Sequence, residues 1–224
     1  MHGLDNPVWA SLRERHAQLG LLARDLGRYR AEVAPFAAVS ADGLDAAAGL
    51  EQLVHPGEEV LFVGPAPRLP AHWQVQAPVP IAQMVSPARI ESNGLAQVIL
   101  LGEVHLADML ALTALVYPHY FRPGTPRMGR YIGIYDGTVL AAMAGERMGF
   151  DGHQEISAVC SHPDHTGRGH ARQLVAELNN AIVAAGQVPF LHVSPQNTRA
   201  KALYEQLGFR HRRDVLLRAV RRPA

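Results

Sequence analysis

The sequence predicts an α/β (α+β) fold in which a mixed, mostly antiparallel sheet is flanked by helices. Two observations predict it. Three adjacent β-rich segments are joined by tight turns, the first at Asp136-Gly137, and such turns favour antiparallel hairpins. A strand at residues 155–161, a helix from Gly169 and a second strand at residues 188–194 then follow, and this crossover makes the two strands parallel.

Length and charge narrow the class of protein. A chain of 224 residues can hold one large or two small domains. Lys plus Arg (21) and Asp plus Glu (20) leave a net charge of +1, which argues against a nucleic-acid or membrane partner selected by bulk charge. The single cysteine excludes an internal disulfide, and no apolar run reaches the roughly 18 residues of a membrane-spanning helix. We therefore expect a cytoplasmic protein without a signal peptide.

The first ninety residues predict a small α/β section whose role the sequence does not reveal. We expect a helix over residues 6–33 with Asn6 as its N-cap, a strand at 36–40, a helix at 44–53 and a strand at 59–63. Residues 73–85 include Pro78 and Pro80, so we expect an edge strand there at best. Turn formers cluster over residues 86–94 and mark a boundary between domains 1–90 and 95–224. The first section is either an extension packed on the second domain or a degenerate half related to it.

The second domain alternates strands and helices. In order, we expect a strand at residues 96–101, a helix at 106–117, a loop at 118–130, strands at 131–135, 138–148 and 155–161, the helix after Gly169, a strand at 188–194, a helix at 197–207 and final strands over 209–220. In the loop, Tyr120, Phe121 and Arg122 either line a substrate entrance or simply pack on the surface.

The most informative stretch is the bend between the strand at residues 155–161 and the helix after it. Gly167 and Gly169 flank Arg168, so the backbone can turn tightly and nothing bulky covers its N–H groups. One apolar stripe then marks the helix: Ala171, Leu174, Val175, Leu178 and Ile182. Unpaired N–H groups and the helix dipole converge at such a bend, so we expect a phosphate or pyrophosphate at residues 167–172.

Two common phosphate loops are excluded by the residues present. A Walker A loop needs Lys and Ser or Thr after its last glycine, whereas His170 and Ala171 follow Gly169. A dinucleotide fingerprint needs a third glycine where Arg172 stands.

The loop Thr166-Gly167-Arg168-Gly169-His170-Ala171 instead resembles the GCN5-related N-acetyltransferase (GNAT) family, which carries (Arg/Gln)-x-x-Gly-x-(Gly/Ala) between a strand and a helix. Thr166 departs from the usual Arg or Gln. A second motif, Asn197-x-x-Ala200-x-x-Leu203-Tyr204-Glu205-x-x-Gly208-Phe209, matches the family's late helix and last strands. The resemblance, closest to FR47-like and glycine N-acyltransferase-like proteins, covers roughly Leu95 to the C-terminus. It implies the GNAT fold, with two parallel strands that splay apart.

The resemblance also implies acetyl-CoA as co-substrate and a set of contacts for it. The pantetheine arm enters the gap between the splayed strands and pairs with the first strand as an added strand would. The implied contacts are Val159, Cys160, Ser161, Gly167, Arg168, Gly169, His170, Ala171, Arg172 and Asn197. Asn197 equally suits the N-cap of its helix. The histidine spacing matches no standard zinc set, so we expect no metal.

Two residues are candidates for catalysis. Tyr204 lies two helical turns after Asn197 and matches the family tyrosine beside the coenzyme sulfur, where it acts as an acid; the alternative is a packed core tyrosine. Glu155 stands fourteen residues before Gly169, a spacing that the catalytic glutamate of histone-type members shares. The alternatives to Glu155 as base are His192 and a water chain. Cys160 is a small core residue rather than an acylated nucleophile.

These residues imply an acyltransferase, specifically an N-acetyltransferase acting on a primary amine by direct attack in a ternary complex. Two other functions stay open: a non-catalytic acyl-CoA-binding sensor, and an acyltransferase that uses a longer acyl-CoA with an amino-acid acceptor. The expected partner is a small amine or amino-acid-like acceptor. A peptide acceptor and a homodimer are also left open.

Overall fold

The structure is a computed structural model that describes residues 2–86, 88–92, 94, 96–118 and 120–224. Its strands are β1 (Gly20–Ala23), β2 (Leu26–Tyr29), β3 (Phe36–Val39), β4 (Glu59–Val63), β5 (Gln74–Val75), β6 (Val79–Val85), β7 (Ile99–Leu101), β8 (Tyr131–Asp136), β9 (Val139–Phe150), β10 (His153–Ser161), β11 (Val188–Val193) and β12 (Arg210–Arg221). Its helices are α1 (Pro7–Arg13), α2 (Ala47–Leu53), α3 (Leu106–Val116), α4 (His170–Ala184) and α5 (Thr198–Gln206). Short 3₁₀ turns lie at Gly3–Asp5, Ala17–Leu19, Glu103–His105, Thr125–Met128 and Pro163–His165.

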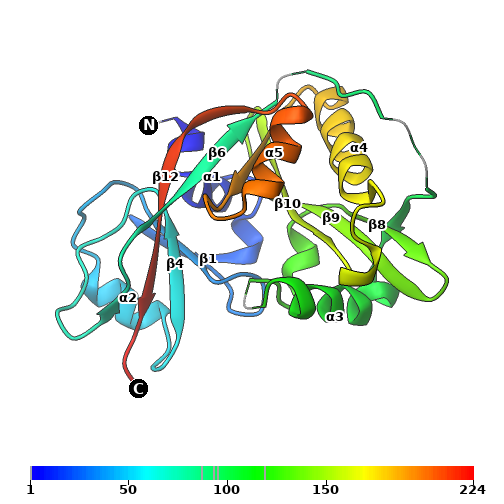
Figure 1. Cartoon of the computed structure of the whole chain (residues 1–224). Coiled ribbons are helices and arrows are strands. Elements are labelled where there is room, and N and C mark those ends of the chain that lie inside the picture. Colours follow the sequence, from blue (N-terminus) through cyan, green and yellow to red (C-terminus); the bar gives the residue numbers. More distant parts are fainter. Residues whose placement is uncertain (1, 87, 93, 95, 119) are drawn as a thin grey trace.

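The strands form one sheet in the order β1-β2-β3-β4-β12-β6-β11-β10-β9-β8-β7, with β5 paired to β12 (Figure 1). Within the described residues only β3 with β4 and β10 with β11 pair in parallel. The prediction of a mixed, mostly antiparallel sheet is therefore confirmed, as is the parallel strand–helix–strand crossover.

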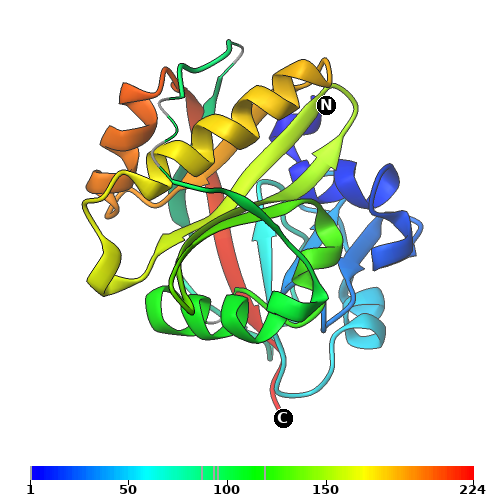
Figure 2. The same ribbon diagram turned by 90° about the vertical axis from the view of Figure 1, so that its right-hand side faces the viewer.

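Helices cover both faces of this sheet (Figure 2). Successive side chains of β9 point to opposite faces of the sheet. Ala142 and Ala144 pack with α4 on one face, whereas Met143 between them packs with α3 on the other. Helix α5 lies on the α4 side, and α1 packs over β3 and β9. None of the described helices is long and apolar enough to cross a bilayer.

The predicted helix over residues 6–33 is wrong beyond its first two turns. Helix α1 ends at Arg13, and a hairpin of β1 and β2 follows it. All four residues of β2 are buried because β2 pairs with both β1 and β3, and this tertiary pairing overrides local helix propensity. Asn6 is the N-cap with Pro7 at the first position, but its side chain donates to the Val39 carbonyl at 2.7 Å instead of capping.

The expectation of an edge strand at residues 73–85 is also wrong, because β6 lies between β11 and β12. Pro80 is tolerated because β11 reaches only residues 82–85, which leaves Pro80 paired on one side, with Leu216 of β12. A strand from the first ninety residues thus sits in the middle of the sheet. At the predicted boundary, Pro87, Asn93 and Leu95 lie outside the described residues.

Candidate active site

The two parallel strands β10 and β11 separate soon after they begin. Residues 153–155 pair with residues 188–190, after which β11 continues paired to β6 alone. Beyond Glu155, β10 carries a bulge: its register with β9 shifts between Ser157 and Cys160, and Ala158 adopts a φ of 53°. A left-handed φ is rare for a residue with a Cβ, and bulges of this kind redirect a strand. The predicted splay is therefore present.

A groove of about 430 Å³ runs from this splay to the glycine loop. We call it the loop groove. Its lining is Val116, Val159, Cys160, Ser161, His165, Thr166, Gly167, Arg168, Gly169, His170, Ala171, Arg172, Asn197, Arg199, Ala200, Leu203, Tyr204 and Gln206. Every residue that the sequence suggested for coenzyme binding lies here, together with Tyr204.

The loop supplies a row of backbone donors. Within the described part of the chain, no backbone N–H from residue 167 to residue 172 donates a hydrogen bond, and the first paired amide is that of Gln173, which donates to the Gly169 carbonyl at 3.1 Å. Gly169 is the N-cap of α4, so these amides stand at the positive end of its dipole. Six unpaired amides at a helix N-terminus form an anion site.

Both loop glycines have backbone angles that only glycine adopts freely. Gly167 has a φ of 78° and Gly169 a φ of 80°. Nothing lies within 4 Å of where a Cβ would stand on either, so the space above the amides is open. An open cradle of unpaired amides fits the diphosphate of an acyl-CoA.

The charged residues around the cradle differ in their freedom. Arg168 is tied down because its Nη1 donates to Oδ2 of Asp136 at 2.8 Å, in the β8–β9 turn. The side chains of Arg172 and Arg199 also line the groove and make no hydrogen bond or ion pair with a described residue, so both can turn toward an anion. Asn197 caps α5, since its Oδ1 accepts from the Ala200 N–H at 3.1 Å.

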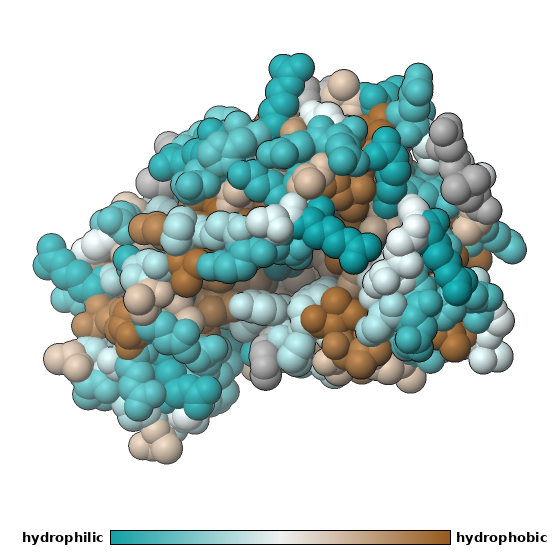
Figure 3. All heavy atoms as spheres, viewed as in Figure 1, coloured by the Kyte–Doolittle hydropathy of each residue, from teal (hydrophilic) through white to brown (hydrophobic). Residues whose placement is uncertain are grey.

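A second cavity of about 300 Å³ adjoins the loop groove and shares Val159, Asn197, Ala200 and Tyr204 with it. We call it the gap cavity. On the face seen in Figure 1, the molecular surface is hollowed near its middle (Figure 3). The gap cavity is lined by Phe36, Val63, Ile81, Tyr117, Tyr120, Arg147, Ile156, Ser157, Ala158, Val159, His192, Val193, Ser194, Asn197, Ala200, Tyr204 and Leu217. Residues of β3, β4 and β6 thus contribute to its wall.

Tyr204 stands where the two cavities meet, since it lines both. Its side chain is 7 % exposed, and its hydroxyl has no hydrogen-bond partner among the described residues. Burial, with a smaller effect of Cys160, raises the pKa of Tyr204 to about 12. The phenol therefore stays protonated at neutral pH and can donate a proton.

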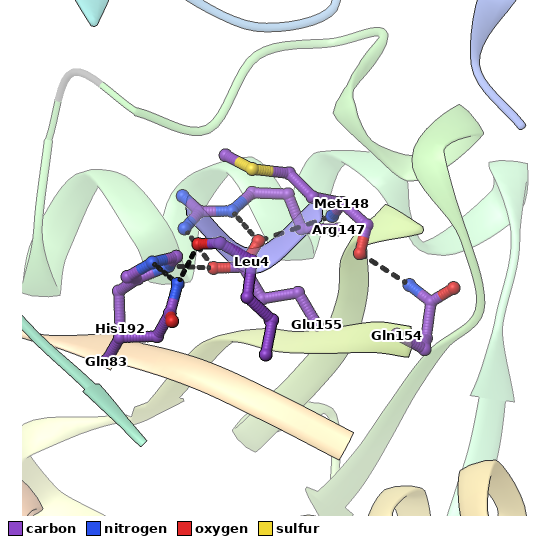
Figure 4. A network of polar contacts seen from close by, with 7 residues as sticks. All are labelled: Leu4, Gln83, Arg147, Met148, Gln154, Glu155 and His192. Carbon is purple, nitrogen blue, oxygen red and sulfur yellow. Dashed lines mark hydrogen bonds and ion pairs between the residues drawn. The ribbon is translucent and has the colours of Figure 1, made fainter. Parts of the chain in front are cut away.

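Glu155 lines neither cavity and is fully buried. Figure 4 shows its contacts with Arg147 and His192. Its Oε2 accepts from Nε of Arg147 at 2.9 Å and its Oε1 from Nη2 at 2.7 Å; Oε1 is also 2.7 Å from Nδ1 of His192. Burial favours the neutral acid, but the charge of Arg147 and the hydrogen bonds from Arg147 and His192 outweigh it and lower the pKa of Glu155 to about 2. Such a carboxylate is a weak base.

The neighbours of His192 fix its tautomer. Gln83 donates from Nε2 to the Leu4 carbonyl at 2.8 Å, and its Oε1 accepts from Nη1 of Arg212 at 2.8 Å, so its amide cannot be flipped. The same Nε2 is 3.0 Å from Nε2 of His192, which must therefore accept. The ring proton is then on Nδ1 and is donated to Glu155. Both nitrogens of His192 are engaged.

Cys160, the single cysteine of the chain, is buried where β10 lines the loop groove. Cys160 packs against Met109 and Met143, and burial raises the pKa of its thiol to about 12, so it is not a thiolate nucleophile. No group of three or more His, Cys, Asp and Glu residues able to hold a metal ion occurs among the described residues.

Sequence reasoning missed several residues of the two cavities. The sequence predicts Tyr117 only as the end of a helix and Arg147 only as part of a hairpin strand. Both reach the gap cavity because the sheet brings β9 and the end of α3 beside β10. No local pattern marks them, since their position depends on pairing between distant segments.

Comparison with known proteins places these features in a family. Residues 131–218 match the family described as FR47-like protein. The solved structure of a GNAT-family protein from Novosphingobium aromaticivorans DSM 12444 is 33 % identical, with a TM-score of 0.89 and 100 % of both chains covered. A GCN5-related N-acetyltransferase-like protein from Streptococcus suis 89/1591 is 15 % identical (TM-score 0.59; 96 % of this chain and 92 % of that one). A GCN5-related N-acetyltransferase from Kribbella flavida is 16 % identical (TM-score 0.58; 96 % of each chain). Comparison with curated proteins gives no match.

Proposed function

Because the chain belongs to the GNAT family of acyltransferases, we propose that it transfers an acetyl group from acetyl-CoA to a primary amine by direct attack in a ternary complex. One observation carries this proposal: Tyr204 lines both the loop groove and the gap cavity. A thioester in the groove and an amine in the cavity would therefore meet beside a protonated phenol.

The loop groove has the parts that acyl-CoA requires. The unpaired amides of residues 167–172 can hold the diphosphate, and Arg172 and Arg199 can add charge. Pairing of β10 with β11 ends at Glu155, so on that side the backbone of Val159, Cys160 and Ser161 has no strand partner among the described residues and can pair with the amide-rich pantetheine arm. Bound in this way, acetyl-CoA supplies the activated acyl thioester.

The transfer itself needs little covalent help from the protein. The amine nitrogen bonds to the acyl carbon, the carbon–sulfur bond breaks, the sulfur gains a proton and the amine loses one. Tyr204 gives its proton to the sulfur and recovers one from solvent. Holding both reactants in adjoining cavities contributes most of the rate, because orientation alone is worth on the order of 7–11 kcal/mol in intramolecular reactions.

Removal of the amine proton falls to solvent in this proposal. His192 is the only His, Asp or Glu that lines the gap cavity among the described residues, and both of its nitrogens are engaged. Glu155, predicted as the base, has a pKa of about 2 and spends its oxygens on Arg147 and His192. We therefore assign Glu155 and His192 to positioning Arg147 and the end of β11.

A thiol-release assay with acetyl-CoA and a panel of amines tests the function. We expect release that depends on the amine, and saturable binding of acetyl-CoA by calorimetry. Tight binding without release from any amine would favour an acyl-CoA sensor over an enzyme. The absence of any binding would contradict both.

A further inference from the structure

We propose that the acceptor is a small apolar α-amino acid, whose carboxylate lies between Arg147 and Tyr117 and whose side chain lies on the apolar wall of the gap cavity. This inference rests on the function proposed above and adds the class of acceptor. Three independent features carry it: a free edge of Arg147, a buried hydroxyl without a partner on Tyr117, and the composition of the cavity wall.

Arg147 presents unused donors to the gap cavity, which it lines. Its Nε and Nη2 are committed to Glu155, whereas Nη1 has no acceptor among the described residues. The guanidinium also packs over the ring of Phe36, with Cζ of Arg147 4.9 Å from the ring centre. A guanidinium fixed in this way offers an oriented pair of N–H groups, which suits a carboxylate oxygen.

Tyr117 supplies a second donor to the same cavity. It follows the last turn of α3, and its hydroxyl oxygen is buried with no hydrogen-bond partner in the described part of the chain. Burial raises the pKa of Tyr117 well above its ordinary value, so the hydroxyl keeps its proton. A buried unpaired hydroxyl is costly, and a ligand oxygen would remove that cost.

The rest of the cavity sets the character of the side chain. Phe36, Val63, Ile81, Val193 and Leu217 form its apolar wall. No Asp or Glu lines it among the described residues, so a second cationic group on the acceptor, as in a polyamine, would have no partner. Its volume of about 300 Å³ lies at the small end of the range for small-molecule sites. Phe36, Val63 and Ile81 come from the first ninety residues, which gives that section a role in selecting the acceptor.

The first experiment compares acceptors that differ only at the carboxylate. Thiol release from acetyl-CoA is measured with free leucine, with 3-methylbutylamine, which lacks the carboxylate, and with leucinamide, which keeps the carbonyl but not the charge. We expect kcat/KM for leucine to exceed that for either analogue by about tenfold or more, since hydrogen bonds to a charged group are the strong ones. Equal or better turnover of 3-methylbutylamine or leucinamide would overturn the inference while leaving the proposed function intact. If no amine releases thiol, the proposed function itself fails.

The second experiment removes one hydroxyl. Tyr117→Phe should raise KM for leucine by about 10- to 100-fold and leave KM for 3-methylbutylamine unchanged. Tyr131→Phe is the matched control, because Tyr131 is also buried with an unpaired hydroxyl but does not line the cavity. It should change neither value.

Binding gives a readout that does not depend on turnover. Leucine titrated into the coenzyme-A-bound protein should give saturable heat, weakened about 10- to 100-fold by Tyr117→Phe and unchanged by Tyr131→Phe. Melting temperatures of both variants should equal or exceed that of the unsubstituted protein, since each loses an unsatisfied polar group. A Tyr117→Phe protein that melts normally and binds leucine as well as the unsubstituted protein would overturn the inference.

Discussion

Glu155 and His192 lie side by side on the two strands that separate, with Oε1 of Glu155 2.7 Å from Nδ1 of His192. Because parallel pairing of β10 and β11 ends at Glu155, this contact spans the strands where the gap opens. The bond joins the edges of the gap and belongs to a network that reaches Arg147 on one side and Gln83 on the other (Figure 4).

The network predicts a single tautomer of His192. Gln83 can only donate to Nε2, so the proton should be on Nδ1 near neutral pH. Long-range proton–nitrogen NMR of labelled protein separates the two ring nitrogens by their chemical shifts. Gln83→Met should release Nε2 and broaden or shift its signal. A protonated Nε2 in the unsubstituted protein would contradict this arrangement.

Substitution of Glu155 should lower the free energy of unfolding while leaving proton transfer in the reaction unchanged. Glu155→Gln leaves the Arg147 guanidinium without a counter-charge in a buried place, which costs about 3–5 kcal/mol in the free energy of unfolding. Glu146→Gln is the control, because its pair with Arg130 is partly exposed and should cost about 1 kcal/mol or less. Denaturant unfolding measures both. Among Glu155→Gln molecules that stay folded, the pH dependence of kcat/KM should keep its shape; loss of its acidic limb would restore Glu155 as the base.

Acid should destabilise the protein through the same carboxylate. The folded-state pKa of Glu155, about 2, lies below its ordinary value of 4.5, so its contribution to stability is complete above about pH 4.5 and is lost as the pH falls toward 2. The contribution is on the order of 3 kcal/mol. Unfolding free energies measured between pH 6 and pH 2 should therefore fall more steeply for the unsubstituted protein than for Glu155→Gln. Parallel curves would refute the assignment.

Tyr204 should matter for turnover and little for binding. Tyr204→Phe removes the proton donor where the two cavities meet, and we expect kcat to fall about 100-fold, the low end for general acid catalysis. The dissociation constant of acetyl-CoA from calorimetry should change less than about threefold, because the ring remains. Unchanged kcat would remove the acid role.

The glycine cradle can be tested with a matched pair of glycines. Gly169→Ala should cost about 1 kcal/mol of stability, because alanine resists a φ of 80°, and should also weaken acetyl-CoA binding about tenfold or more by shifting the amides. Gly186 has a φ of 74° and equally open surroundings but lies after α4, away from the loop. Gly186→Ala should carry the same stability cost with unchanged binding. Equal binding by both variants would argue against the cradle.

The sequence predicted the parts of the site that are local. The glycine loop with its helix, the hairpin at Asp136-Gly137 and the helix that carries Tyr204 all depend on residues close together in the chain, and each lies where expected. The surroundings of Glu155 could not be predicted in this way. Its partner Arg147 depends on the register of β9 against β10, and His192 on the end of parallel pairing with β11.

In the first ninety residues, predictions from local sequence also fail where distant segments pair. Locally, residues 6–33 favour a helix, and Pro80 disfavours a central strand. Pairing of β2 with β3 outweighs the local preference for a helix. Pro80 is accepted in a central strand because β11 pairs only with residues 82–85 of β6. Both outcomes depend on strands that are far away in the sequence.

The place of β6 has a consequence for any attempt to divide the chain. A fragment that starts after residue 90 would keep β11 and β12 but lose the strand that lies between them, so each would present a bare row of amides and carbonyls to solvent. Such a fragment would tend to recruit strands from its neighbours and aggregate. We therefore expect that the glycine loop and the helix that carries Tyr204 cannot be excised as an independent module.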